Sequence, residues 1–262
     1  MATVGDFCRF LNQFAPPELA ESWDNTGLLI GREGSVVHRA LTCLTLTHEV
    51  AREAAESGAQ LIVTHHPLMF RGTKTITDRT VEGRTLLALI ESGIAVYSPH
   101  TSFDSASEGI NQQLAESFGL QNIVPLKPLL TNPAAGSGRV GDLLSSTELN
   151  LFLKTVKEVI SADRIEYSGR PDSIVRRVAV GCGAAEGFLS DAVRLGCDTF
   201  VTGEARFHTA LEAQAQGVNL VLTGHYFSER PAVEDLAVIL VGEFPGVQIS
   251  ASRNDRNPLR LF

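Results

Sequence analysis

Four of the seven histidines come directly after short apolar segments that read as strands: His65, His66, His100 and His225. In open α/β sheets, ligands bind at the carboxyl ends of the strands, so we expect these four side chains to share one edge. Asp104 and Glu229 stand four residues beyond His100 and His225. That spacing is roughly one helical turn, so each pair can present an imidazole and a carboxylate together.

Imidazole and carboxylate together are the ligands of divalent Zn, Mn, Fe or Co. One ion takes three or four protein ligands, and this chain offers six candidates: His65, His66, His100, Asp104, His225 and Glu229. This number suits two ions about 3.5–4 Å apart, bridged by a carboxylate and a water or hydroxide. A single histidine after a strand is more often a cap or a surface residue, which we expect for His38 and His48. Three such strand ends in one chain indicate a metal site.

The elements that must position these residues alternate between strands and helices. Strands are expected over Leu41–Leu46, Leu61–Thr64, Ile94–Tyr97, Val178–Val180, Thr199–Thr202, Leu220–Leu222 and Val247–Ser250. Helices are expected over His48–Ser57, Val81–Glu91, Ser107–Phe118, Thr147–Val159, Glu186–Leu195, Phe207–Gln216 and Ser228–Leu240. This alternation predicts an α/β fold built on parallel strands with crossover helices.

The second half of the chain resembles the first. A shift of 138 positions places Gly58 on Gly196 and Thr64 on Thr202, and an offset of 125 places His100 on His225. Although any two α/β units share such features, we interpret the match as an internal duplication of a βαβαβ unit. The result would be two similar βαβ-type domains, with the metal site at the carboxyl ends of the strands between the domains.

Prolines and glycines are dense between Pro125 and Gly141, which predicts a domain boundary or a long connection there. The first α/β domain is therefore expected over residues 1–128 and the second over 129–262. The C-terminal helix could pack back on the first domain.

The same shift places Glu204 on His66, and His208 follows four residues later. These two side chains could contact substrate or relay protons near the metal site. Alternatively, Glu204 complements the charge of a helix N-terminus and His208 is a surface residue.

Two further segments could contribute to the site. The turn Glu21–Gly27 surrounds the only tryptophan, Trp23. Either a buried Trp23 holds this turn, or Asp24 or Asn25 touches a ligand. After the histidine pair, Arg71, Lys74 and Arg79 could bind an anion such as phosphate, or they are solvated surface charges.

Composition excludes several classes of protein. The chain has 262 residues, of which 44% are hydrophobic and 20% charged, so a disordered chain is excluded. The net charge of −8 argues against a surface that coats duplex nucleic acid. No apolar run reaches the ~20 residues of a membrane helix, and we see no secretory signal. Cys8, Cys43, Cys182 and Cys197 are expected to be reduced core thiols of a cytoplasmic protein, not metal ligands.

The motifs together resemble the NIF-three-like family, whose members are often labelled GTP cyclohydrolase I type 2 homologs. The matching segments are ESWDNTGLLIG, LIVTHHPLMFRG, SPHTSFDSASEGINQQLAE, TGEARFHTALEA and LTGHYFSERPAVEDL. The resemblance implies two similar α/β domains, two divalent metal ions per chain and a toroidal homohexamer. The family's ligands fall on His65, His66, Asp104, His225 and Glu229. His100 matches a histidine near the site rather than a ligand, and Glu204 stands where the family commonly has Asp.

The resemblance leaves enzymatic activity open between two main hypotheses. The first is a metal-dependent hydrolase in which a metal-bridged hydroxide attacks a nucleotide-like substrate, with His100, His208 and Glu204 as catalytic candidates. For GTP, ring opening would release formate, whereas a phosphoesterase would release orthophosphate or a cleaved ester. The second is a non-enzymatic metal-binding regulator or hexameric interaction scaffold. Metal-assisted action on a threaded DNA strand is a weaker third hypothesis.

Overall fold

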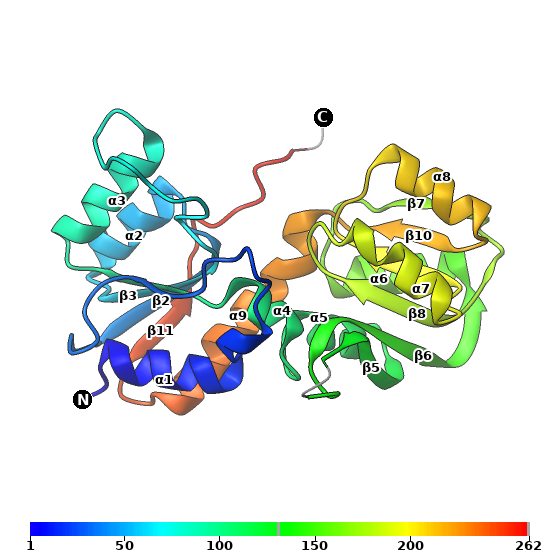
Figure 1. The fold of residues 1–262 in the computed structure, drawn as a ribbon, viewed down its shortest axis with the longest axis horizontal. Helices are drawn as coiled ribbons and strands as arrows, with labels where there is room; N and C mark the ends of the chain where they lie inside the picture. The colour runs from blue at the N-terminus through cyan, green and yellow to red at the C-terminus, as the bar shows by residue number, and fades with distance from the viewer. Residues whose placement is uncertain (130–131, 261–262) are drawn as a thin grey trace. The chain divides into compact units, whose positions relative to one another are not determined.

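The chain forms two sheets, each covered by its own helices (Figure 1). The computed structural model describes residues 1–129 and 132–260. One unit comprises Met1–Phe103 with Ala232–Phe262, and the other comprises Asp104–Pro231. The chain passes from the first unit to the second within helix α4 (His100–Ser105) and returns within helix α9 (His225–Glu243).

The sheet of the first unit has five strands in the order β1-β4-β3-β2-β11. Its strands are β1 (Gly27–Ile30), β2 (Arg39–Thr45), β3 (Leu61–His66), β4 (Ala95–Ser98) and β11 (Gln248–Ala251). Its remaining helices are α1 (Val4–Phe14), the short η1 (Pro17–Leu19), α2 (His48–Ser57) and α3 (Val81–Glu91). Strands β11, β2, β3 and β4 are parallel, and β1 adds an antiparallel edge.

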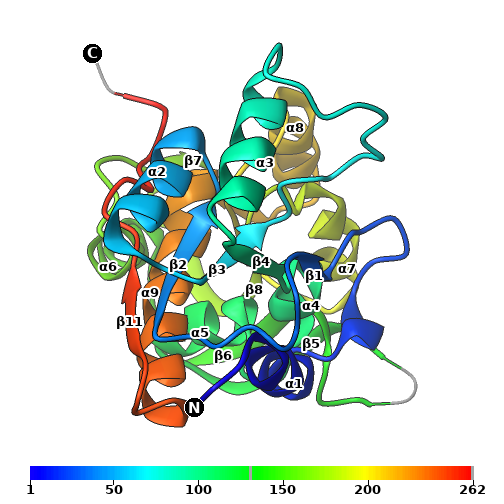
Figure 2. The same ribbon diagram turned by 90° about the vertical axis from the view of Figure 1, so that its left-hand side faces the viewer.

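Helices cover both faces of this sheet (Figures 1 and 2). Because successive strand residues point to opposite faces, Leu41 and Cys43 of β2 pack towards α2 and α3. Thr42 points to the other face, where its hydroxyl donates to the Val233 carbonyl of α9. The strands are therefore buried on both sides, as parallel strands usually are.

The sheet of the second unit has six strands in the order β5-β6-β8-β9-β10-β7. Its strands are β5 (Leu120–Pro128), β6 (Gly136–Glu148), β7 (Glu166–Ser168), β8 (Ile174–Gly181), β9 (Thr199–Thr202) and β10 (Asn219–Leu222). Its helices are α5 (Ile110–Ser117), α6 (Leu149–Val159), the short η2 (Glu186–Phe188), α7 (Leu189–Arg194) and α8 (Phe207–Ala215). Strands β8, β9 and β10 are parallel, while β5, β6 and β7 are antiparallel additions.

The expected strand–helix alternation is present in both units. Each contains three parallel strands joined by helices, β2-α2-β3-α3-β4 in one and β8-α7-β9-α8-β10 in the other. Helices α2 and α3 have the bounds that the sequence predicts. The sequence pattern does not predict α1, α4 or the antiparallel strands β5, β6 and β7. None of the helices in the described part of the chain combines the length and the hydrophobicity that a membrane-spanning helix requires.

The proline- and glycine-rich stretch is part of a hairpin within the second unit. Strands β5 and β6 pair antiparallel across it, and positions 130–131 lie outside the described residues. The expected boundary at 128/129 thus falls at the end of β5, inside Asp104–Pro231. Pro125 and Pro128 fit here because β5 is an edge strand, where a missing N–H donor is tolerated.

A buried arginine ties this hairpin to the segment after α4. Arg139 of β6 is fully buried, and its Nε donates to Gln112 Oε1 at 2.8 Å. The remaining guanidinium nitrogens donate to the carbonyls of Gly136, Gly138 and Ala106. Burial lowers the pKa of Arg139 to about 10, so the side chain stays charged at neutral pH. These bonds hold the end of the α4 segment, which begins the second unit with Asp104.

We expect Arg139→Leu to lower the free energy of unfolding by about 3 kcal/mol, because it leaves buried carbonyl groups without hydrogen-bond donors. Urea denaturation followed by circular dichroism measures this loss. The control is Arg170→Leu, which removes an exposed arginine paired with Asp172 and should cost under about 1 kcal/mol. Equal unfolding midpoints for the two variants would show that Arg139 does not hold the hairpin.

Candidate metal-binding groups

Three histidines of the first unit meet where β3 ends and α4 begins. His65 and His66 are the last two residues of β3, and His100 is the first residue of α4. One ring nitrogen of each lies within 4.8 Å of the others, and His65 is buried. The sequence prediction that these three side chains share one sheet edge is confirmed within this unit.

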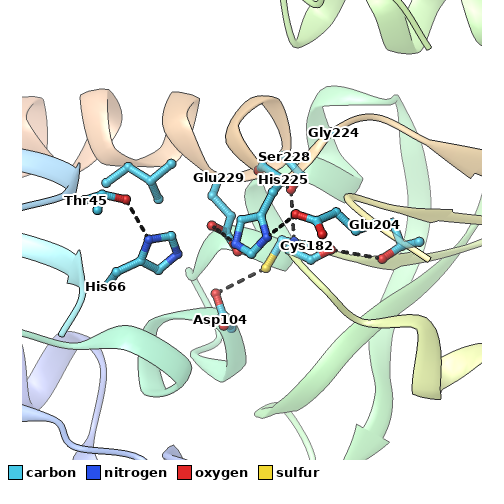
Figure 3. Close-up of polar contacts among 12 residues, drawn as sticks. Thr45, His66, Asp104, Cys182, Glu204, Gly224, His225, Ser228 and Glu229 are labelled. Atoms are coloured by element: carbon cyan, nitrogen blue, oxygen red, sulfur yellow. Dashed lines mark hydrogen bonds and ion pairs between the residues drawn. The ribbon is translucent and has the colours of Figure 1, made fainter. Parts of the chain in front are cut away.

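Neighbouring side chains hold two of these rings through Nδ1. Thr45 is the register partner of His66 in the β2–β3 pair, and its hydroxyl is hydrogen-bonded to His66 Nδ1 at 2.8 Å (Figure 3). His100 Nδ1 donates to Asp24 Oδ1 at 2.6 Å. Each of these two rings therefore has its orientation fixed through one nitrogen, which leaves Nε2 as the other possible ligand atom.

Asp24 is also bound by the residue that follows His100. Its Oδ2 accepts from the backbone N–H of Thr101 at 3.1 Å and from the Thr101 hydroxyl at 2.5 Å. Burial opposes ionisation of this carboxyl, but the hydrogen bonds from His100 and Thr101 outweigh it and lower the pKa of Asp24 to about 2. His100 itself has a positive φ of 32°, which is uncommon outside glycine. The Asp24 contacts hold this unfavourable backbone in place.

The second unit has its own group at the start of α9. His225 and Glu229 are one helical turn apart, with His225 Nε2 at 3.1 Å from Glu229 Oε2. The other ring nitrogen, Nδ1, donates to Glu204 Oε1 at 2.7 Å, so the ring lies between two carboxylates (Figure 3). The hydrogen bond to Glu229, with the charges of both carboxylates, raises the pKa of His225 to about 9 despite partial burial.

Asp104 is linked to a buried cysteine of the loop after β8. Cys182 Sγ donates to Asp104 Oδ1 at 3.2 Å, and burial next to Asp104 and Glu229 raises the pKa of this thiol well above its usual range. Asn111 joins the two residues, because its amide donates to the Asp104 carbonyl and accepts the Cys182 N–H at 2.8 Å. Cys182 is a free, buried cysteine, as the sequence predicts. Its thiol also donates a hydrogen bond to Asp104.

Two glycines let the backbone approach this group closely. A Cβ on Gly183 would lie 2.3 Å from Glu229 Oε1, and one on Gly203 would lie 2.8 Å from Ser228 Oγ. Gly183 has a φ of +60°, and its N–H donates to Ser228 Oγ at 3.0 Å. Its carbonyl accepts the N–H of Glu204, so this glycine supports both carboxylate-bearing segments. Any larger residue at 183 would displace the Glu229 carboxylate.

The chemistry of these side chains fits divalent first-row metals. Each unit offers imidazole nitrogens, and the second adds the carboxylates of Asp104 and Glu229. Histidines that bind metals almost always use their second nitrogen to bond a carboxylate or another oxygen. Asp24, Thr45 and Glu204 occupy that role here. These clusters could therefore bind a metal ion.

The structure separates the other candidates. Glu204 is hydrogen-bonded to His225, whereas exposed His208 on α8 contacts the ring of Phe207. Trp23 is 57% exposed, so a buried tryptophan does not hold the Glu21–Gly27 turn. Instead, Asp24 and Asn25 hold it, the latter by donating to the Met69 carbonyl at 2.7 Å.

Four residues that support these two groups are not predicted from the sequence: Thr45, Asn111, Cys182 and Gly183. The only local signal is the Gly181-Cys182-Gly183 triplet at the end of β8, because glycines there allow a close backbone approach. The roles of Asn111 and Cys182 depend on contacts between distant segments, which no spacing reveals.

We expect Asp24→Ala to release the turn that carries Trp23, because it removes the acceptor of His100 and Thr101. Loss of these bonds should lower the free energy of unfolding by roughly 1–3 kcal/mol. Time-resolved fluorescence anisotropy of Trp23, the only tryptophan, should gain a fast component. In the control Glu21→Ala, an exposed side chain of the same turn is removed, and the decay should not change. An unchanged decay in Asp24→Ala would contradict the anchoring role.

The chain is similar to known proteins along nearly its whole length. The family model Duf34/NIF3 (NGG1p interacting factor 3) matches residues 2–258. The GTP cyclohydrolase 1 type 2 homolog of Clostridium perfringens is 33% identical, with 88% of each chain covered. The GTP cyclohydrolase 1 type 2 of Helicobacter pylori is 30% identical over 100% of each chain. The crystal structure of Staphylococcus aureus hypothetical protein SA1388 is similar, with a TM-score of 0.92, 28% identity and 99% of each chain covered. The chain therefore belongs to the Duf34/NIF3 family.

Proposed function

We propose that this protein is a metal-dependent hydrolase that acts on a nucleotide-like substrate. Its metal ligands would be His65, His66, Asp104, His225 and Glu229, and together they would hold two divalent ions, Zn, Mn, Fe or Co. The observation that carries the proposal is the support of the histidine rings. An oxygen of Thr45 or Glu204 bonds Nδ1 of the proposed ligands His66 and His225, as second partners of metal-bound histidines do.

Two divalent ions, when bound, would supply an activated water and positive charge for a developing oxyanion. The protein's own side chains would orient the ligands and move protons. Glu204 fixes the ring of His225, and Asp24 fixes the ring of His100. His100, which is only partly buried, would carry a proton between substrate and solvent, and exposed His208 is the alternative carrier.

The names of the relatives support a nucleotide-like substrate. Those from Clostridium perfringens and Helicobacter pylori carry the description GTP cyclohydrolase 1 type 2, the former as a homolog. Opening of the GTP imidazole ring would release formate, whereas phosphoester hydrolysis would release orthophosphate or a cleaved ester. A product-resolved assay of GTP with the metal-loaded protein distinguishes these two reactions.

A non-enzymatic role is the second candidate. The family description refers to an interacting factor, and so to a protein interaction. Under this alternative, the metal groups would serve a regulator or an interaction scaffold. Absence of both formate and phosphate from a nucleotide panel, with metal still bound, would favour it.

We also propose an internal duplication and a homohexamer. The duplication is supported by the shared strand–helix order of the two units, and by His100 and His225 each starting a helix after the third parallel strand. The toroidal homohexamer rests on the family resemblance. Sedimentation equilibrium should give six times the chain mass of 28.2 kDa, and a mass of one chain would contradict it.

We expect about two metal ions per chain in protein purified without added metal or a histidine tag. His65→Ala and Glu229→Ala should each lose metal, because each removes a ligand. His38→Ala removes an exposed histidine of the first unit and should keep the full content. Elemental analysis measures all four proteins. No metal in the wild type, even after reconstitution with Zn or Mn, would refute the ligand assignment.

Gly183→Ala tests the shape of the site without removing a ligand. The added Cβ would collide with Glu229 Oε1, so we expect Zn affinity to fall at least about tenfold by isothermal titration. Gly187→Ala is the matched control, because a Cβ there meets nothing within 4 Å. Circular dichroism should show both variants folded. Equal Zn affinity in the two variants would show that the Gly183 contact with Glu229 is irrelevant to metal binding.

A further inference from the structure

Two aromatic side chains beside His100 remain half exposed. Trp23 and Phe70 are 57% and 51% exposed, and their ring centroids are 5.7 Å apart. The ring of His100 lies 6.1 Å from Trp23 and 6.2 Å from Phe70. All three belong to the first unit. The pair therefore presents a large aromatic surface to solvent directly next to a histidine of the candidate metal group.

The backbone that carries this pair is tightly held although the rings are not buried. The Glu21 N–H donates to the Thr101 hydroxyl at 3.0 Å, and Asp24 accepts from His100 and Thr101. Asn25 donates to the carbonyl of Met69, the residue before Phe70, at 2.7 Å. These bonds fix the Trp23 turn and the Phe70 segment to each other. Rings that are exposed on a fixed backbone bind a ligand at low entropic cost.

The segment after Phe70 adds positive charge. Residues 67–84 carry four basic and two acidic side chains, in a chain whose net charge is −8. Arg71, Lys74 and Arg79 are exposed, and within the described residues no ion pair involves them. The acidic side chain of Glu82 accepts a hydrogen bond from Thr73. An anionic group near Phe70 would therefore find unpaired cations.

We propose that Trp23 and Phe70 stack a planar heteroaromatic ring of the substrate, with its phosphate facing Arg71, Lys74 and Arg79. This inference rests on the proposed function, because it places the ring beside His100. Aromatic side chains stack on the face of any base, and arginine and lysine bind phosphate. The inference assigns the recognition of the ring to residues that are not metal ligands. The competing explanation is that the two side chains only form an apolar wall around the histidines.

Trp23 is the only tryptophan, so its emission reports on this site alone. We would titrate the purified protein with GMP and AMP, correcting for absorption by the purine, and compare guanosine and ribose 5-phosphate. Both nucleotides should quench Trp23 saturably, guanosine more weakly, and ribose 5-phosphate should not compete at the same concentrations. Equal binding of ribose 5-phosphate and GMP would overturn the stacking proposal.

Variants distinguish stacking from an apolar wall. Phe70→Leu keeps apolar bulk but loses the ring, so GMP affinity should fall roughly fivefold or more. Tyr167→Ala removes a 46% exposed aromatic side chain from β7 of the second unit and should bind GMP like the wild type. Arg71→Gln should lower the affinity for GMP but not the affinity for guanosine, which has no phosphate. If Phe70→Leu bound GMP as tightly as the wild type, stacking would be refuted, and the two side chains would only form an apolar wall around the histidines.

Metal content measured on the same samples separates this inference from the proposed function. Phe70→Leu should keep the metal content of the wild type, because Phe70 supplies no ligand. A protein that holds metal but does not bind GMP would refute the inference alone. Ring-dependent GMP binding by a protein that cannot be loaded with metal would refute the metal proposal and leave the stacking site standing.

Discussion

In each unit, the candidate metal-binding group depends on how its histidine rings are held. A histidine at the end of a strand has two free torsions, and only a partner at Nδ1 fixes the direction of Nε2. Thr45, Asp24 and Glu204 supply these partners for His66, His100 and His225. Each partner comes from a neighbouring strand, turn or loop. The packing of that neighbouring segment therefore places the oxygen that bonds Nδ1.

Close backbone packing is a further constraint on the candidate group of the second unit. The loop after β8 reaches the first turn of α9 only because residue 183 has no side chain. The same loop places Cys182 on Asp104, while Asn111 and Arg139 hold the segment that carries Asp104. The buried polar groups of the second unit therefore form connected hydrogen bonds around the carboxylates, which reduces the cost of their burial.

The sequence predicts the elements that have a local sequence pattern, such as the alternating strands and helices. Apolar runs followed by histidines identify β3, β4 and β10, because the period of a strand and the break after it are local features. The sequence places the following helices later, at Ser107 and Ser228, and so misses α4 and the first turn of α9. The prolines and glycines of the β5–β6 hairpin predict a domain boundary instead of two strands. Proline interrupts a central strand, but it is tolerated in an edge strand such as β5. The contacts of Asn111 and Cys182 connect segments 71 residues apart, so only the folded chain reveals them. The sequence predicts the turn around Trp23. It does not predict that Trp23 is exposed or that Asp24 anchors the turn to His100 and Thr101.

Anomalous X-ray diffraction from crystals of the protein, purified without added metal, would show directly whether these side chains bind two metal ions. Data collected on both sides of the Zn, Fe, Co and Mn absorption edges identify each bound ion and locate it. We predict two anomalous peaks within bonding distance of ligand atoms of His65, His66, Asp104, His225 and Glu229. Crystals soaked in Zn and Mn that show no peak at these side chains, or peaks only elsewhere, would contradict it.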